Sequence, residues 1–334
     1  MSLVRLCNYI LSCFLTAATW GMVVLIPGSL NAAPMESLIL ALSKTPLSLP
    51  FYVAQSQGYF EGEGVQIKIN DVIGGVRTMQ QLLGGAVDLA TSSDTVVMFN
   101  SFGRKDFAVL SSFVTSDEDV RMIAGPNMVS LQPAHIVGKR IGTIIASASH
   151  YYLDNWLLFH GVDPKNVTVV GLAPEAMELA LIKGNVDAVS VWEPFGYKIL
   201  RDVPRVRVYP NPGTHTLSFN LMVHAKHVGV KDAELVKILR ALDRAQRFIK
   251  AEPLKAQAIL RERLQIDQPY IDWIWPRYHY ALALDQSLLV TLESQARWAR
   301  QEGYVAAARS PNYLDFIYPG PLSAVRRDAV GIVK

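Results

Sequence analysis

The sequence predicts an α/β protein of two similar lobes, each a mostly parallel sheet flanked by helices. Short apolar runs alternate with helix-like segments from residue 37 onward, which is the order of parallel β-α-β units. This order recurs after about 100 residues, and amphipathic helices without a counterpart in the repeat follow it. A length of 334 residues is enough for two domains.

The first copy of the repeat contains three predicted strands and three predicted helices. Two of the helices follow glycine or serine loops, and glycines such as Gly58 and Gly84 end two of them. The strands are Ser37–Leu42, Val65–Asn70 and Val87–Ala90, and the helices are Phe51–Gln57, Val76–Leu83 and Thr95–Phe102. The order gives one β-α-β-α-β unit with right-handed crossovers.

The second copy repeats the same order. Its predicted strands are Arg140–Ala146, Val167–Gly171 and Val186–Val191, and its helices are Tyr151–His160 and a segment from Pro174 to Lys183. The nonapeptides Leu82–Ala90 and Leu181–Val189 share Leu, Gly, Val and Asp in register. Several matches at nearly one offset indicate a duplicated unit.

The helices after the repeat are expected to join the first lobe. Leu217–Val223 is a predicted strand that returns from the second lobe, and Asp232–Lys250, Glu252–Leu264 and Gln286–Gln301 are the predicted helices. We expect the chain to cross between lobes at Ala124–Pro126 and at Met222–Ala225. The first lobe then contains residues 33–125 and 225–334, and the second contains residues 126–224. Two crossings form a hinge, and the lobes enclose a cleft.

Residues 1–32 have the pattern of a secretory signal peptide. Residues 6–26 are uncharged and largely apolar, and small residues follow, so we expect cleavage after Ala32. An uncleaved membrane anchor and a lipoprotein processed at Cys13 are the alternatives. Because Cys7 and Cys13 are the only cysteines, the exported product would have no disulfide and no thiolate site.

Charge and motifs exclude several function classes. The net charge is +3, and no basic cluster with interleaved aromatics points to nucleic acid. The sequence has no P-loop, G-x-S-x-G, H-E-x-x-H or G-x-G-x-x-G motif. His224 and His227 form H-x-x-H without supporting ligands, so we expect surface histidines rather than a zinc site. We expect no catalytic residues, metal or cofactor.

The candidate ligand site is predicted from topology. Ligands of open parallel sheets bind beyond the carboxyl ends of strands, where helices begin. Free N–H groups at helix starts, with Ser and Thr hydroxyls, hold an oxyanion without a full cation. For each serine the alternative is a plain helix N-cap. The candidate residues are Thr45, Pro46, Leu47, Tyr52, Gly74, Gly75, Arg77, Ser92, Ser93, Asp94, Ser147, Ser149, His150, Trp192 and Glu193.

Three of these candidates carry distinct chemistry. Arg77, in the first turn of its helix, would add a positive charge to an anion site. Trp192 would supply an aromatic wall, and Glu193 would accept from an amine or hydroxyl of a ligand. A core position for Trp192 and a turn-capping role for Glu193 are the structural alternatives.

Several stretches carry a resemblance to a known family. They are Pro50–Phe60, Gly138–Gly142, Gly184–Phe195 and Ile317-Tyr318. Their order and spacing resemble the periplasmic substrate-binding proteins of ABC importers in the nitrate, sulfonate and taurine family, which is related to thiamine-precursor binding proteins. The resemblance covers residues 36–320.

The resemblance implies a two-lobed type II periplasmic-binding-protein fold that closes over its ligand. It implies a monomeric periplasmic protein that captures a small anion, such as a sulfonate, taurine or nitrate, without chemistry. The partner would be an ABC permease in the inner membrane. A thiamine-precursor-like heterocycle as ligand, an enzyme on the same fold and a sensor domain are the alternatives.

Overall fold

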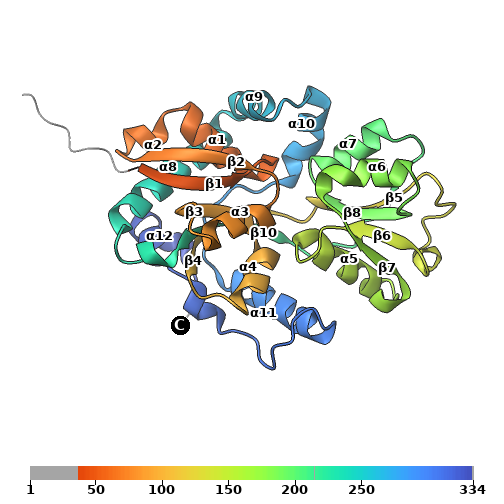
Figure 1. Ribbon diagram of the computed structural model, residues 1–334. Coiled ribbons are helices and arrows are strands. Elements are labelled where there is room, and N and C mark those ends of the chain that lie inside the picture. Colours follow the sequence, from red (N-terminus) through yellow and green to blue (C-terminus); the bar gives the residue numbers. More distant parts are fainter. Residues whose placement is uncertain (1–36, 214, 333–334) are drawn as a thin grey trace, which may run out of the picture. The chain divides into compact units, whose positions relative to one another are not determined.

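Two five-stranded mixed sheets organise the fold of the computed structural model, which describes residues 37–213 and 215–332 (Figure 1). The first sheet has the order β2-β1-β3-β10-β4 and contains β1 (Ser37–Ser43), β2 (Gln66–Val72), β3 (Leu89–Ser93), β4 (Phe107–Ser116) and β10 (Leu217–His224). The second has the order β7-β6-β8-β5-β9 and contains β5 (Val120–Ala124), β6 (Arg140–Thr143), β7 (Thr168–Gly171), β8 (Ala188–Trp192) and β9 (Arg207–Val208). Both belong to one compact unit of the chain.

The helices divide between the two sheets. Near the first are α1 (Leu49–Ser56), α2 (Tyr59–Gly62), α3 (Gly75–Leu83), α4 (Asp94–Ser101), α8 (Asp232–Ala251), α9 (Pro253–Leu264), α10 (Gln268–Ile274), α11 (Gln286–Gln301) and α12 (Gly320–Val325). Beside the second are α5 (Ala148–Phe159), α6 (Met177–Ile182) and α7 (Phe195–Asp202). Helices from the end of the chain return to the first sheet: α8 packs on α1 and α2, and α11 packs on α4.

Both sheets have the same topology, which confirms the two-copy α/β prediction. In the first, β1 runs parallel to β2 and β3, and β10 runs antiparallel between β3 and β4. In the second, β6 runs parallel to β7 and β8, and β5 runs antiparallel between β8 and β9. The antiparallel strands make both sheets mixed.

The chain changes sheets at other points than the sequence predicted. The residues of β5 were expected in the first lobe but pair in the second sheet, whereas β10 was expected in the second lobe but pairs in the first sheet. Both strands gain antiparallel partners on either side in these positions. The chain therefore changes sheets at residues 117–119 and again between residues 209 and 216.

The repeated aspartate makes the same contact in both copies. Asp88 Oδ2 accepts from the Ile39 backbone N–H at 2.9 Å, and Asp187 Oδ2 accepts from the Arg140 backbone N–H at 2.8 Å. In return, the backbone N–H of each aspartate donates to the carbonyl of the same partner. Each aspartate thus joins the loop before one strand, β3 or β8, to the beginning of the neighbouring parallel strand, β1 or β6.

Basic side chains reinforce both aspartates. His227 Nε2 lies 2.7 Å from Asp88 Oδ1, and this histidine is buried against the carboxylate. The expectation from sequence that it lies on the surface is therefore wrong. Burial would raise the pKa of Asp88, but the Ile39 N–H and His227 outweigh it and the pKa lies below its usual value. Arg140 forms the corresponding ion pair with Asp187 at 3.0 Å.

The predicted leader, residues 1–32, lies outside the described residues. Within residues 37–213 and 215–332, no helix has the length and apolar character needed to cross a membrane.

Replacing either repeated aspartate by alanine is expected to destabilise the protein. Asp88→Ala leaves the Ile39 N–H without its acceptor, which lowers the free energy of unfolding by about 1–3 kcal/mol. Asp187→Ala is expected to have a similar effect on the second sheet. Urea denaturation measures both. Asp88→Asn, which keeps an oxygen acceptor, is the control; equal stability of Asp88→Ala and the parent would contradict the assignment.

Candidate functional site

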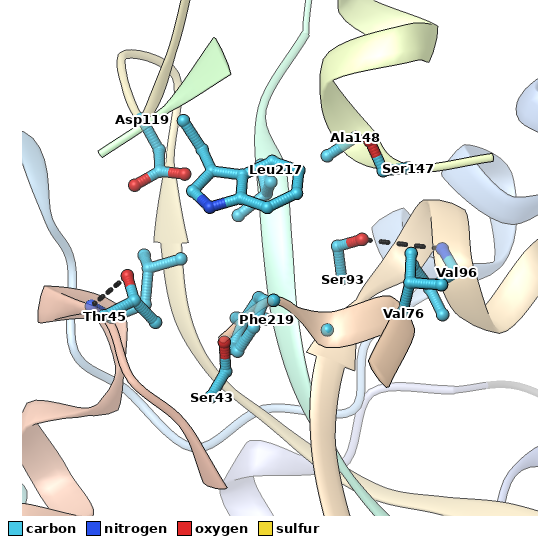
Figure 2. A pocket seen from close by; sticks show the side chains of 14 residues that line it. Ser43, Thr45, Val76, Ser93, Val96, Asp119, Ser147, Ala148, Leu217 and Phe219 are labelled. Atoms are coloured by element: carbon cyan, nitrogen blue, oxygen red, sulfur yellow. Dashed lines mark hydrogen bonds between the residues drawn. The ribbon is translucent and has the colours of Figure 1, made fainter. Parts of the chain in front are cut away.

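A pocket has walls from both sheets (Figure 2). The first sheet and its loops and helices contribute Ser43, Thr45, Leu47, Gly74, Gly75, Val76, Ser93, Val96, Leu217 and Phe219. The second sheet and its connections contribute Asp119, Ser147, Ala148 and Trp192. The walls are mostly apolar, with a few hydroxyls and one carboxylate.

Three helices begin at this pocket. They are α3, which begins at Gly75, α4, which begins after Ser93, and α5, which begins after Ser147. The first N–H groups of a helix have no partner within the helix and carry its partial positive charge. Figure 2 places Val76, Ser93 and Ser147 on the same side of the pocket. This side is therefore suited to an oxyanion.

The serine side chains at these helix starts are held differently. Ser93 Oγ accepts from the Val96 N–H at 3.4 Å, which is an N-cap contact. Ser147 makes no cap contact; its hydroxyl donates to the Ile144 carbonyl at 2.6 Å and lies 3.0 Å from Ser149 Oγ. The N-cap alternative thus holds for Ser93 and not for Ser147.

Two glycines bring the walls close together. Gly74 has φ +87°, and a Cβ there would lie 3.3 Å from Trp192 Cζ2. A Cβ on Gly75 would lie 2.4 Å from Ser92 Oγ and 3.1 Å from Ser92 Cα. Side chains at these positions would push α3 away from β3 and from the indole that the second sheet contributes.

Asp119 is the one ionisable side chain among the described residues that line the pocket. It is 2 % exposed, and the Tyr278 hydroxyl donates to Oδ1 at 2.6 Å. Burial raises the pKa of Asp119 to about 7, against the opposing effects of Tyr278 and Arg121. Figure 2 places its carboxylate on the side of Thr45, across the pocket from Ser93 and Ser147.

The structure brings seven of the fifteen predicted site residues together at the pocket. They are Thr45, Leu47, Gly74, Gly75, Ser93, Ser147 and Trp192. The other eight lie outside the lining: Pro46, Tyr52, Arg77, Ser92, Asp94, Ser149, His150 and Glu193.

Most of these eight residues support the walls. Ser92 is buried under Gly75 because β3 extends to Ser93, so alternate strand residues face opposite sides. Asp94 accepts from the Ser218 backbone N–H at 2.8 Å, which ties α4 to β10. The carbonyl of Ser149 accepts from the hydroxyl of Ser190 on β8 at 2.7 Å.

Two further residues hold the loop after β1. Tyr52 OH donates to the Ser43 carbonyl at 3.5 Å, and the carbonyl of Pro46 accepts from Tyr280 OH at 3.0 Å. Both residues are buried, and they fix the backbone beside Ser43 and Thr45.

Glu193 takes the structural alternative. Its side chain is fully buried, accepts from the Tyr197 N–H at 3.0 Å and lies 3.3 Å from Arg121 Nε. Burial raises the pKa of Glu193 to about 8, although Arg121 and the Tyr197 N–H act in the opposite direction. Glu193 therefore caps the beginning of α7, and Arg121 stacks at 4.3 Å on the ring of Trp273.

Arg77 and His150 lie at contacts between the parts built on the two sheets. Arg77 Nη1 lies 2.7 Å from Glu175 Oε1. The ring of His150 packs at 4.5 Å from that of Tyr304, and burial lowers the pKa of His150 to about 4. Beside it, Asp154 of α5 accepts from Trp298 Nε1 of α11 at 3.1 Å. These contacts join the parts built on the two sheets.

Sequence reasoning missed seven lining residues: Ser43, Val76, Val96, Asp119, Ala148, Leu217 and Phe219. Asp119 lies in the turn between β4 and β5, and neither strand was predicted. Ser43 and Ala148 lie in the predicted loops at residues 43–50 and 147–150 but were not among the candidates. Val76, Val96, Leu217 and Phe219 have the residue types of ordinary core positions. The described residues contain no group of three or more His, Cys, Asp or Glu that could hold a metal ion.

The chain belongs to the NMT1/THI5-like family, whose model matches residues 45–256. It is 30% identical over 156 residues to a protein of Bacillus subtilis (strain 168) named as a binding protein, YtlA, covering 43% of this chain and 45% of that one. It is 30% identical over 126 residues to the taurine-binding periplasmic protein of Escherichia coli (strain K12), covering 35% of this chain and 38% of that one. The matched segments span less than half of either relative.

Solved structures share the fold at low sequence identity. The aliphatic sulphonate binding protein SsuA of Escherichia coli superposes with a TM-score of 0.72 at 18% identity, over 86% of this chain and 92% of that one. The alkanesulfonate-binding protein SsuA of Xanthomonas axonopodis pv. citri, bound to MOPS, superposes with a TM-score of 0.76 at 15% identity, over 86% of this chain and 99% of that one. The desulfurization enzyme DSZB superposes with a TM-score of 0.65 at 12% identity, over 88% of this chain and 99% of that one. The predicted two-lobed periplasmic-binding-protein fold is confirmed.

Alanine at Gly75 is expected to destabilise the protein. At an uncrowded position, Gly→Ala stabilises by reducing the entropy of the unfolded chain. At Gly75 the added methyl group meets Ser92, and we expect a loss of about 1–3 kcal/mol in the free energy of unfolding. Gly103→Ala is the matched control, because nothing lies within 4 Å of its Cβ position. Thermal unfolding measures the effect, and a melting temperature of Gly75→Ala equal to or above that of the parent would contradict the packing described.

Proposed function

We propose that this chain is a periplasmic solute-binding protein that captures a small organic sulfonate in the pocket and delivers it to an ABC permease. The observation that carries the proposal is the convergence of the α3, α4 and α5 N-termini, with Ser93 and Ser147, on one side of a pocket that both sheets enclose. Helix N-termini bind oxyanions through N–H groups without a paired cation. The relative named for taurine and the neighbours named for sulfonates support this ligand class.

The proposed mechanism is capture by closure between two lobes. We propose that the first lobe comprises the sheet containing β1 and β10 and the second comprises the sheet containing β6 and β5. The Arg77–Glu175 ion pair and the Asp154–Trp298 hydrogen bond would form on closing and break on opening. An exposed pair such as Arg77–Glu175 contributes about 0.2–1 kcal/mol, so closure stays reversible.

Export and assembly follow from the same proposal. Residues 1–32 would direct the chain to the periplasm and be removed, and a monomer would present its closed form to the permease.

We propose that the seven predicted lining residues, with Asp119, contact the ligand, and that nitrate is a weaker candidate because the walls are mostly apolar.

A heterocyclic ligand is the second candidate. Trp192 and Phe219 offer aromatic faces, and no Lys, Arg or His is among the described lining residues. Catalysis is less favoured, although DSZB shares the fold. The described lining residues pair their serines with neither a histidine base nor a cysteine.

Calorimetric titration tests the ligand class. We expect one molar equivalent of taurine or a short alkanesulfonate to bind, and nitrate and an aminopyrimidine to bind at least about tenfold more weakly. Ala148→Leu, which fills the pocket from the start of α5, should lower sulfonate affinity by about tenfold or more, whereas Ala258→Leu on the exposed face of α9 should not. Binding of the aminopyrimidine alone would favour the second candidate, and no binding of any compound would refute solute capture by this pocket.

A further inference from the structure

The Asp119 carboxylate has an unusual position for an anion-binding pocket. A buried carboxylate repels an anionic ligand, and burying it costs free energy unless it is paired. Its Oδ1 accepts from Tyr278 OH, while Oδ2 takes part in no hydrogen bond or ion pair within residues 37–213 and 215–332. A polar side chain that is 2 % exposed and lines a cavity therefore has one oxygen without a protein partner.

Neighbouring charges do not neutralise Asp119 directly. Arg121 is the cation whose charge acts on it, but Arg121 pairs with Glu118 at 3.1 Å and lies 3.3 Å from Glu193. The other titratable groups that act on Asp119 are Glu193, Tyr270, Tyr278 and Tyr280, which are acids. The surroundings thus leave the carboxylate oxygen available to a cationic group in the pocket.

The pocket is electrically asymmetric. The N-termini of α3, α4 and α5 supply partial positive charge on the side of Val76, Ser93 and Ser147. The Asp119 carboxylate lies on the opposite side, next to the turn that joins β4 to β5. Apolar side chains, including Leu217 and Phe219, line the space between.

We propose that Asp119 is the specificity-determining residue of this pocket, and that it selects sulfonates carrying an ammonium group over sulfonates that lack one. The inference rests on the proposed capture of sulfonates. The sulfonate would lie at the helix N-termini, the ammonium group would donate to Asp119, and the short alkyl segment would contact the apolar walls. Electrostatic complementarity of this kind discriminates between ligands of equal size because the mismatched ligand leaves a buried charge unpaired.

Three ligands of similar size and four proteins test this inference. The ligands are taurine, 2-hydroxyethanesulfonate and ethanesulfonate, each titrated calorimetrically into the parent protein and into three variants. The variants are Asp119→Asn, Tyr278→Phe, which keeps the carboxylate but removes its hydrogen bond, and Asp243→Asn. The last is the matched control, because Asp243 is 3 % exposed on α8 and pairs with Arg326 away from the pocket.

The parent is expected to bind taurine at least about 30-fold more tightly than the other two ligands, since an unpaired buried charge has a cost of that size. Asp119→Asn should lose most of the taurine affinity and keep or improve binding of ethanesulfonate. Asp243→Asn should behave as the parent. Tyr278→Phe should retain the preference for taurine, which keeps the test valid if Asp119→Asn fails to fold.

The pH dependence separates charge recognition from an alternative role of Asp119. An ammonium group requires the ionised carboxylate, so taurine affinity should fall as the pH is lowered from about 8 to about 5.5, through the raised pKa of Asp119. If protonated Asp119 instead donates to the sulfonate, affinity would rise over the same range, which would overturn the inference. Equal binding of all three ligands would also overturn it and leave sulfonate capture intact. Binding of none would refute the proposed function itself.

Discussion

The contacts of Asp88 and Asp187 are the constraint on which the rest of the structure depends. Each aspartate holds the backbone at the beginning of β1 or β6, and both do so through N–H and C=O groups of a single partner residue. With β1 and β6 fixed in this way, the strands that follow in each copy end at equivalent points. The helices after these strands therefore begin at corresponding edges, and the pocket forms where the two edges meet.

Dense packing brings the walls of the pocket together at these edges. Gly74 and Gly75 allow α3 to approach β3 and the Trp192 indole more closely than any side chain would permit. Three helix N-termini supply positive potential without a Lys or Arg among the described lining residues, and a single carboxylate opposes them. In a poorly solvated space such fixed dipoles and charges act strongly, so a near-neutral protein needs no basic surface to hold an anion.

Much of the fold could be predicted from the sequence. The strands corresponding to β1, β2, β3, β6, β7, β8 and β10 are short apolar runs, and the amphipathic pattern of Gln286–Gln301 coincides with α11. By contrast, β4 and β5 are apolar runs separated only by a short acidic turn, and no helix signal divides them. Because β4 and β5 were not predicted, the first crossing was expected at the end of β5, and the second was expected at the end of β10. The chain instead changes sheets before each of these strands.

The site was harder to predict because side-chain direction depends on neighbouring strands and helices. Ser92 and Ser93 are adjacent, yet only Ser93 faces the pocket, because β3 continues two residues beyond Thr91 and its side chains alternate. Arg77 points to Glu175 rather than to the pocket, a contact that requires the second sheet to be in place. Asp119 became visible as a candidate only through its burial beside Tyr278.

The orientation of a bound aminosulfonate tests the account most directly. A crystal structure of the taurine complex should place the sulfonate at the N-termini of α3, α4 and α5, with the ammonium nitrogen about 2.7–3.2 Å from an Asp119 carboxylate oxygen. A ligand bound in the reverse orientation, or outside the space between Thr45 and Ser147, would contradict it.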